Sequence, residues 1–302
     1  MGNLYVSVGD NTNPFASDGF APIDEIANRS PWDAQKSAAN PNDLRGKINR
    51  IHPEPDGSYT IPEGNLFPPG TPGTRPEIYV MGNRNPFRIS IDQRTGYLYW
   101  GEVGPDAGWP KDGRGPAGYD EVNQAREAGF FGWPYFIGNN KPYNDFDFAG
   151  KESGERFVAA KPVNDSPNNT GRHDLPPAQG AFIYYAHFPS TQFPVVNKGG
   201  GRTAMAGPVY YFDPELKSDR KLPESFDHTL FIYEWSRNWI IAIKLDENNK
   251  IEKMEPFAAG LTFKRPMDIE MGPDGCLYVI EFGTAWGNNK DTQLVRIEYT
   301  GK

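Results

Sequence analysis

The chain has 302 residues, of which 37% are hydrophobic and 14% aromatic, with a formal net charge of −8 and a pI near 5.2. This acidic balance disfavours nucleic acid and anionic membranes as partners, because both need a basic surface that releases counterions. The single cysteine, Cys276, excludes an intrachain disulfide framework and a thiolate metal cluster, and no apolar run is long enough to span a bilayer.

Four strand cores of one type recur along the chain. They read GNLYVSVGD, GYLYWGEVG, HTLFIYEWS and GCLYVIEFG, and their shared leucines are Leu4, Leu98, Leu230 and Leu277. The last two leucines are 47 residues apart, near the length of one four-stranded propeller blade, and the first two are 94 apart, twice that length. The middle interval of 132 residues fits two blades and a long insertion, which we place in the loop-rich region around 139–177.

Further short segments between these cores are rich in β-branched and aromatic residues and are bounded by turn formers. They cover 45–51, 77–82, 87–92, 181–186, 207–212, 239–245 and 293–299. A helix is predicted only over 120–128, where DEVNQAREA holds good helix formers. The pattern predicts an all-β fold in one domain over 1–302. A sandwich, a barrel and a propeller all fit such a repeat, but the long irregular connections favour a propeller, of which the chain supplies about four blades.

Seven motifs occur in a fixed order along nearly the whole chain. They are LYVSVGDN, LRGKINRI, YVMGNRNPFRISID, GEVGPDA, YDEVN, FGWPYFIGNN and GPDGCLYV. Together they resemble the glucose/sorbosone dehydrogenase family, the soluble aldose dehydrogenases that use pyrroloquinoline quinone (PQQ), and in particular its large secreted bacterial members. The resemblance implies a six-bladed β-propeller with the quinone near its axis, and a periplasmic or extracellular parent protein, although this chain carries no signal peptide.

The resemblance also implies two calcium sites. Gly104 and Pro105 match a Gly-Pro pair whose carbonyls hold the Ca²⁺ that acts as Lewis acid on the quinone. Asp120 and Glu121 match carboxylates at a second, structural calcium site. Read from the residues alone, Gly104-Pro105 is a turn and Asp120-Glu121 a charged pair at a helix start.

Cofactor contacts follow from the resemblance at five positions. Arg84 and Asn85 lie in the NRNP corner that shapes the central site, and Arg265 matches one of two arginines that hold the quinone, whose second position is Met267 here. Arg237 stands near the place of a lysine of the same pocket, and Asn13 is a polar candidate in the first loop. Alone, NRNP is a turn with a salt-bridged arginine, and Asn13 fits an Asx-turn.

The catalytic residue is unknown, because the family's base is a histidine upstream of the first motif. We therefore expect the chain as given to begin just after that base and to lack the N-terminal blades, with a turn like Gly-Pro-Asp-Gly and a histidine encoded before Met1. The histidines present are interpreted as loop or packing residues. Open sheet edges in such a ring predict self-association.

Two other functions fit the same residues. One is a carbohydrate-binding propeller that keeps calcium and lacks redox chemistry, which the absent base favours; a sugar would then stack on Trp32, Trp109 or Trp286, whereas Trp133 is interpreted as structural. The other is a calcium-assisted lyase or hydrolase that uses Asp10, Glu102 or Asp106, although no carboxylate pair at a fixed spacing supports it. Our leading prediction is the PQQ-dependent oxidation of an aldose or related sugar, incomplete in this chain.

Overall fold

The computed structural model describes residues 2–189, 191–196 and 198–301, and within them the fold is almost entirely β. Helical structure in these ranges is limited to three short 3-10 turns, η1 (Ser30–Trp32), η2 (Ala34–Lys36) and η3 (Glu224–Phe226). No helix among the described residues is long and apolar enough to cross a membrane.

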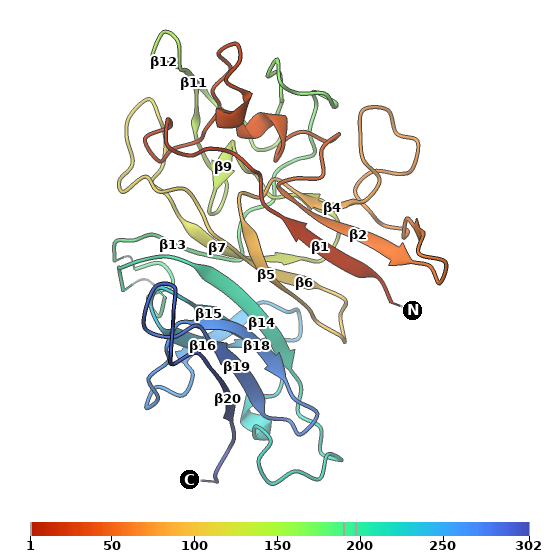
Figure 1. The fold of residues 1–302 in the computed structure, drawn as a ribbon, viewed down its shortest axis with the longest axis vertical. Coiled ribbons are helices and arrows are strands. Elements are labelled where there is room, and N and C mark those ends of the chain that lie inside the picture. The colour runs from red at the N-terminus through yellow and green to blue at the C-terminus, as the bar shows by residue number, and fades with distance from the viewer. Residues whose placement is uncertain (1, 190, 197, 302) are drawn as a thin grey trace.

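The strands form successive antiparallel sheets along the chain (Figure 1). The first sheet has the order β1 (Leu4–Val8), β2 (Lys47–Pro53), β4 (Ile78–Met81) and a parallel β8 (Gly129–Phe130), with β3 (Tyr59–Thr60) beside β2. The second contains β5 (Pro86–Ile91), β6 (Leu98–Glu102), β7 (Asp120–Ala125) and β13 (Ile183–Tyr185). The third contains β14 (Ala204–Tyr210), β15 (Thr229–Glu234), β16 (Trp239–Leu245) and β17 (Ile251–Pro256). The fourth contains β18 (Pro266–Met271), β19 (Leu277–Glu281) and β20 (Gln293–Ile297).

Two small hairpins lie in the long connection between β8 and β13. They pair β9 (Phe136–Ile137) with β10 (Lys141–Pro142), and β11 (Asn144–Asp147) with β12 (Glu152–Arg156). The hairpins fall in the region where the sequence predicts an insertion. That insertion and the single-domain organisation stay predictions.

The sheets pack face to face because their strands alternate apolar residues toward both neighbours. On β6, Leu98 and Trp100 are buried against the first sheet, while Tyr99 lies in the core shared with the third sheet. The first strands of the second, third and fourth sheets converge: β14 packs against β5 and β18, and Arg88 on β5 donates to the Met267 carbonyl on β18 at 2.9 Å. This convergence is the radial arrangement of a propeller.

Every strand expected from the sequence is present, but the helix predicted over 120–128 is wrong. Asp120–Ala125 is strand β7, which pairs with β6 and β13. Val122 enters the core on one side, and Asn123 donates to Glu121 on the other at 3.0 Å. Sheet pairing on both edges thus overrides the helix propensity of this segment.

The interpretation of the leucine intervals as doubled blades is also wrong. Leu4 and Leu98 lie in the first and second sheets, whose strands β1 and β5 are in contact. Leu98 and Leu230 lie in the second and third sheets, which also pack directly. Long connections, not extra blades, account for the wide spacing, and the blade count stays a prediction.

A buried glutamate closes three of the four repeated strand cores. Glu102, Glu234 and Glu281 each stand four residues after the shared leucine and end β6, β15 and β19. Their exposed fractions are 3%, 0% and 2%. In the first core the equivalent position is Val8.

Each of these glutamates accepts backbone N–H groups from the loop before the first strand of its own sheet. Glu102 binds Arg84 N and Asn85 N, Glu234 binds Thr203 N, and Glu281 binds Lys264 N. The carboxylates satisfy donors that a strand ladder leaves unpaired, so they fix where these loops enter the sheets.

Burial raises the pKa of Glu234 from 4.5 to about 8. The folded state therefore keeps a proton that the unfolded state releases, and this group lowers the free energy of unfolding by at most about 1.4 kcal/mol per pH unit as pH rises from about 4.5 to 8. Glu234→Gln keeps an oxygen acceptor but does not titrate, so urea unfolding should show a flatter pH profile than the wild type. Exposed Glu252→Gln is the control, and parallel profiles for wild type and Glu234→Gln would contradict the prediction.

Candidate strand-end site

All nine predicted site residues lie at one end of the sheets, which we call the strand-end face. In the second, third and fourth sheets the second strand ends where the first strand begins, so the flanking loops meet there, and the loop after β1 joins them. The face carries Asn13 after β1, Arg84 and Asn85 before β5, Gly104 and Pro105 after β6, Asp120 and Glu121 at the start of β7, Arg237 after β15, and Arg265 before β18.

Hydrogen bonds join this face from one sheet to the next. Asp10 N donates to the Arg84 carbonyl at 2.9 Å and links the first sheet to the second. Arg202 Nη2 donates to the Pro105 carbonyl at 2.7 Å and links the second to the third. Arg265 N donates to Asn238 Oδ1 at 2.8 Å and links the fourth sheet to the third. The predicted residues therefore belong to one continuous surface.

Asp10 is buried at the edge of this surface. Its Oδ2 accepts from Trp133 Nε1 at 2.8 Å and its Oδ1 accepts from Thr12 N at 3.1 Å. Burial raises the pKa of Asp10, while the Trp133 bond and the charge of Arg84 oppose the rise. The structural role predicted for Trp133 is consistent with its burial, and its indole N–H also holds a carboxylate in place.

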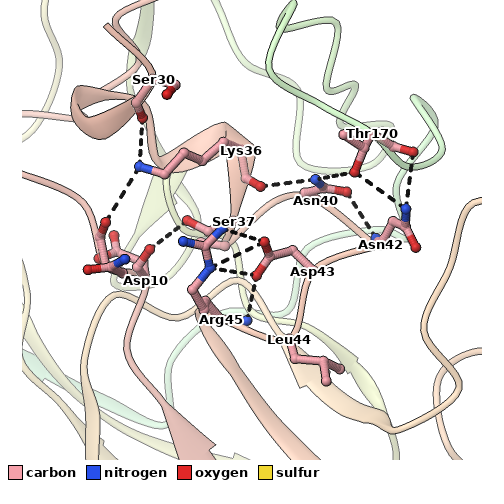
Figure 2. A network of polar contacts seen from close by, with 12 residues as sticks. Asp10, Ser30, Lys36, Ser37, Asn40, Asn42, Asp43, Leu44, Arg45 and Thr170 are labelled. Carbon is pink, nitrogen blue, oxygen red and sulfur yellow. Dashed lines mark hydrogen bonds and ion pairs between the residues drawn. The ribbon is translucent and has the colours of Figure 1, made fainter.

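A groove of about 570 Å³ surrounds Asn13. Its wall includes two cations that the sequence analysis missed, Lys36 and Arg45. Lys36 Nζ donates to the Ser30 carbonyl at 2.6 Å, and the Arg45 guanidinium lies against Asp43, as Figure 2 shows. Asn13 Oδ1 accepts from Phe15 N at 3.0 Å, so its side chain closes an Asx-turn.

Arg84 lies beside the loop that follows β6. Its Nη1 donates to the Val103 carbonyl at 3.0 Å, and its Nη2 is 3.8 Å from Asp106 Oδ2. The side chain is 18% exposed, so part of the guanidinium reaches the surface. Arg84 and its neighbour Asn85 are held at the backbone by Glu102.

The Gly104–Pro105 shelf is buried and already holds a cation. The Pro105 carbonyl accepts from Arg202, whose Nη1 is 3.3 Å from Asp120 Oδ1. Asp120 also accepts from Gly104 N at 3.1 Å and from Ala204 N at 2.9 Å. A Ca²⁺ ion needs six to eight oxygens at 2.3–2.6 Å, and here a guanidinium occupies the Pro105 oxygen. The residues present at this shelf therefore do not fit Ca²⁺.

Glu121 points to the opposite side of β7 from Asp120, because successive strand residues alternate. Its Oε1 accepts from Gly138 N at 2.5 Å and its Oε2 from Asn123 Nδ2. Glu102 lies directly across the sheet, and its Oε2 has no hydrogen-bond partner in the described part of the chain. Burial, together with nearby like charge, raises the pKa of Glu121 to about 7 and that of Glu102 well above its usual range.

This pair of buried glutamates fits a cation better than the shelf does. Glu102 Oε2 and Asn123 Oδ1 both lack a hydrogen-bond partner within the described ranges, and both are hard oxygen ligands that a bound ion would satisfy. The structure does not bring Asp120 into the same group, and within the described ranges no three His, Cys, Asp or Glu side chains form a metal-binding set.

The Arg237 and Arg265 side chains differ in how many hydrogen bonds they donate to the protein. Arg237 donates to four backbone carbonyls, those of Ala186, Val196, Gly200 and Gly201, and so pins one loop. Among the described residues the Arg265 side chain donates one hydrogen bond, to the Ala285 carbonyl at 2.9 Å, and its guanidinium lies against Trp235 and Trp286. Arg265 thus keeps donors for a ligand, whereas Arg237 serves the fold.

A cluster of aromatic side chains lies near the segment that follows Gly104 and Pro105. Trp109 is 65% exposed and stacks on Phe188 with ring centroids 4.8 Å apart and an angle of 8° between the rings. His187 meets the edge of the same stack and lies beside Gly108. We call Trp109, His187 and Phe188 the aromatic platform. Elsewhere, His52 contacts Asn3 and His228 contacts Asn249.

Related proteins of known sequence are similar to this chain over most of its length. The HIPL2 protein of Arabidopsis thaliana is 25% identical and matches 98% of this chain. Quinoprotein glucose dehydrogenase B of Acinetobacter calcoaceticus is 24% identical and matches 95% of it. The chain spans 38% and 58% of these two proteins, so it corresponds to part of each.

Solved structures support the same fold. Two glucose dehydrogenase structures superpose with TM-scores of 0.54 and 0.56 at 19% identity, covering 99% of this chain and 61% of theirs. The chain is a β-propeller. The sequence pattern of the Glucose / Sorbosone dehydrogenase family matches residues 1–197, which include the shelf, the Glu102–Glu121 pair and the aromatic platform. Since this match covers more than half of the sequence, the chain belongs to the glucose/sorbosone dehydrogenase family.

Proposed function

We propose that this protein takes part in the PQQ-dependent oxidation of an aldose or related sugar, in a periplasmic or extracellular setting. Family membership makes it a sugar-dehydrogenase-like oxidoreductase, and one relative is named a quinoprotein. The observation that supports the proposal most is the gathering of Arg84, Asn85 and Arg265 on one strand-end face. Because the chain spans only 38% and 58% of the two relatives and 61% of the glucose dehydrogenase structures, the activity of the whole protein is part of the proposal.

PQQ carries three carboxylates and a quinone that accepts a hydride equivalent when it is bound. Arg84 and Arg265 keep donors that can pair with carboxylates, and Asn85 stands next to Arg84. Lys36 and Arg45 add positive charge at the groove around Asn13. These residues would bind and orient the cofactor, while the Arg237 side chain holds the neighbouring loop.

The first test is direct binding of PQQ, followed by turnover with aldoses and an artificial electron acceptor. We expect PQQ to bind the wild type, and Arg84→Gln or Arg265→Gln to weaken binding about tenfold or more, because each removes a charge-assisted contact of about 1.5–3 kcal/mol. Arg114→Gln removes a buried arginine outside the proposed contacts and is the control. Failure of the wild type to bind PQQ would remove the proposal.

We also propose that Ca²⁺ binds between Glu102 and Glu121. Both glutamates titrate above their usual range, so calcium affinity should increase as pH rises through about 7, where Glu121 loses its proton. Thermal unfolding with Ca²⁺ or with a chelator measures this. We expect Ca²⁺ to raise the melting temperature of the wild type but not that of Glu121→Gln.

Glu234→Gln is the matched control for calcium, because Glu234 is equally buried and both of its oxygens accept backbone N–H groups. That variant should keep the full calcium response. An unchanged calcium response in Glu121→Gln would place the ion elsewhere.

A second candidate function is carbohydrate binding without turnover, which the exposed Trp109 favours. One face of its indole stacks on Phe188, and the apolar face of a sugar ring could stack on the other. Trp109→Ala should abolish a sugar-dependent change in tryptophan fluorescence, while Trp286→Ala, which removes another exposed tryptophan, should leave the change in place. Equal responses in both variants would exclude the platform as the sugar site.

A further inference from the structure

We infer that the guanidinium of Arg202 is the resident cation of the Gly104–Pro105 shelf, and that it keeps Ca²⁺ out of this shelf. The inference rests on the proposed function in one respect, since the family resemblance places the Lewis-acid calcium on these carbonyls. It concerns the residues of this chain, and it holds whether or not the chain oxidises sugars.

The contacts of Arg202 are those of a fixed structural cation. The side chain is 8% exposed, and its partner Asp120 is 1% exposed. One guanidinium nitrogen binds the Pro105 carbonyl at 2.7 Å, and the other lies 3.3 Å from the Asp120 carboxylate. The planar fork of arginine thus bridges a carbonyl and a carboxylate, the same kinds of oxygen that Ca²⁺ would take.

Arg202 has counterparts at the same position in two other sheets. It stands two residues before β14, as Arg84 stands two residues before β5 and Lys264 two residues before β18. Arg84 reaches the carbonyl of Val103 in its own sheet, and Lys264 pairs with Asp291 at 3.6 Å in its own sheet. Arg202 instead reaches across to the second sheet, so Arg84 and Arg202 hold the 103–105 loop from two sides.

Admitting Ca²⁺ at Pro105 would require Arg202 to leave. The departure would break a buried ion pair and leave Asp120 without its cation. Burial already raises the pKa of Asp120, and the charge of Arg202 opposes this rise. A dication cannot share the Pro105 oxygen with a guanidinium 2.7 Å away without strong repulsion at such a buried site. The shelf is therefore closed while Arg202 is in place.

Equilibrium dialysis with radioactive calcium, in the absence of PQQ, tests the inference. Arg202→Gln leaves Asp120 and the Pro105 carbonyl without their cation, so this variant should bind one more Ca²⁺ per chain than the wild type, and Asp120→Asn added to it should abolish the gain. Arg114→Gln is a matched control, because Arg114 is also buried and binds a carboxylate, Asp18, and a carbonyl, that of Ser17. It should gain no calcium.

A second arm keeps Arg202 and does not depend on whether Arg202→Gln folds. Glu121→Gln removes the other proposed calcium site, so we expect it to bind no Ca²⁺. The inference would be overturned if Glu121→Gln still bound one Ca²⁺ per chain and lost it when Asp120→Asn was added. It would also be overturned if folded Arg202→Gln bound no more Ca²⁺ than the wild type. These readouts are independent of PQQ binding and turnover, so failure of the proposed function leaves them unaffected.

Discussion

The loops of the strand-end face depend on buried carboxylates that bind backbone N–H groups. A loop that enters the first strand of a sheet brings donors that no ladder partner satisfies, and in the interior each unsatisfied donor is costly. In three sheets these donors are satisfied in the same way, by a glutamate that accepts them: Glu102, Glu234 and Glu281. Because each glutamate ends the second strand, it ties that strand to the loop that carries Arg84, Arg202 or Lys264.

This arrangement has an electrostatic consequence for the site. In three sheets a cation, Arg84, Arg202 or Lys264, stands two residues before the first strand, at the same end as the buried glutamate of that sheet. Arg202 pairs with Asp120, whereas Glu102 and Glu121 stand opposite each other on β6 and β7, and Glu102 Oε2 has no hydrogen-bond partner among the described residues. On the same face, Asp120 is therefore paired with the cation Arg202, whereas Glu102 and Glu121 stand together without a paired cation in the part of the chain that the structure describes.

The proposed functions draw on different parts of this face. Arg84 and Arg265 keep donors suited to an anionic cofactor, and Trp109 offers an exposed ring next to the shelf loop. Arg237 is fully engaged with backbone carbonyls, so its charge supports the loop that carries His187 and Phe188. Cofactor and sugar sites would then share loops whose positions are set by buried polar contacts rather than by apolar packing.

The sequence by itself determined the family, the repeated strand cores and the strand segments predicted between them, because two-residue alternation and turn formers are local signals. It also contained a glutamate four residues after three of the four repeated leucines, a local pattern that precedes any tertiary information. Only the tertiary structure decided that 120–125 is a strand, that Asp120 and Glu121 face opposite sides, and that Arg202 reaches Pro105. Those outcomes depend on which loops meet between sheets, and residues about 100 positions apart, such as Pro105 and Arg202, carry no local mark of that meeting.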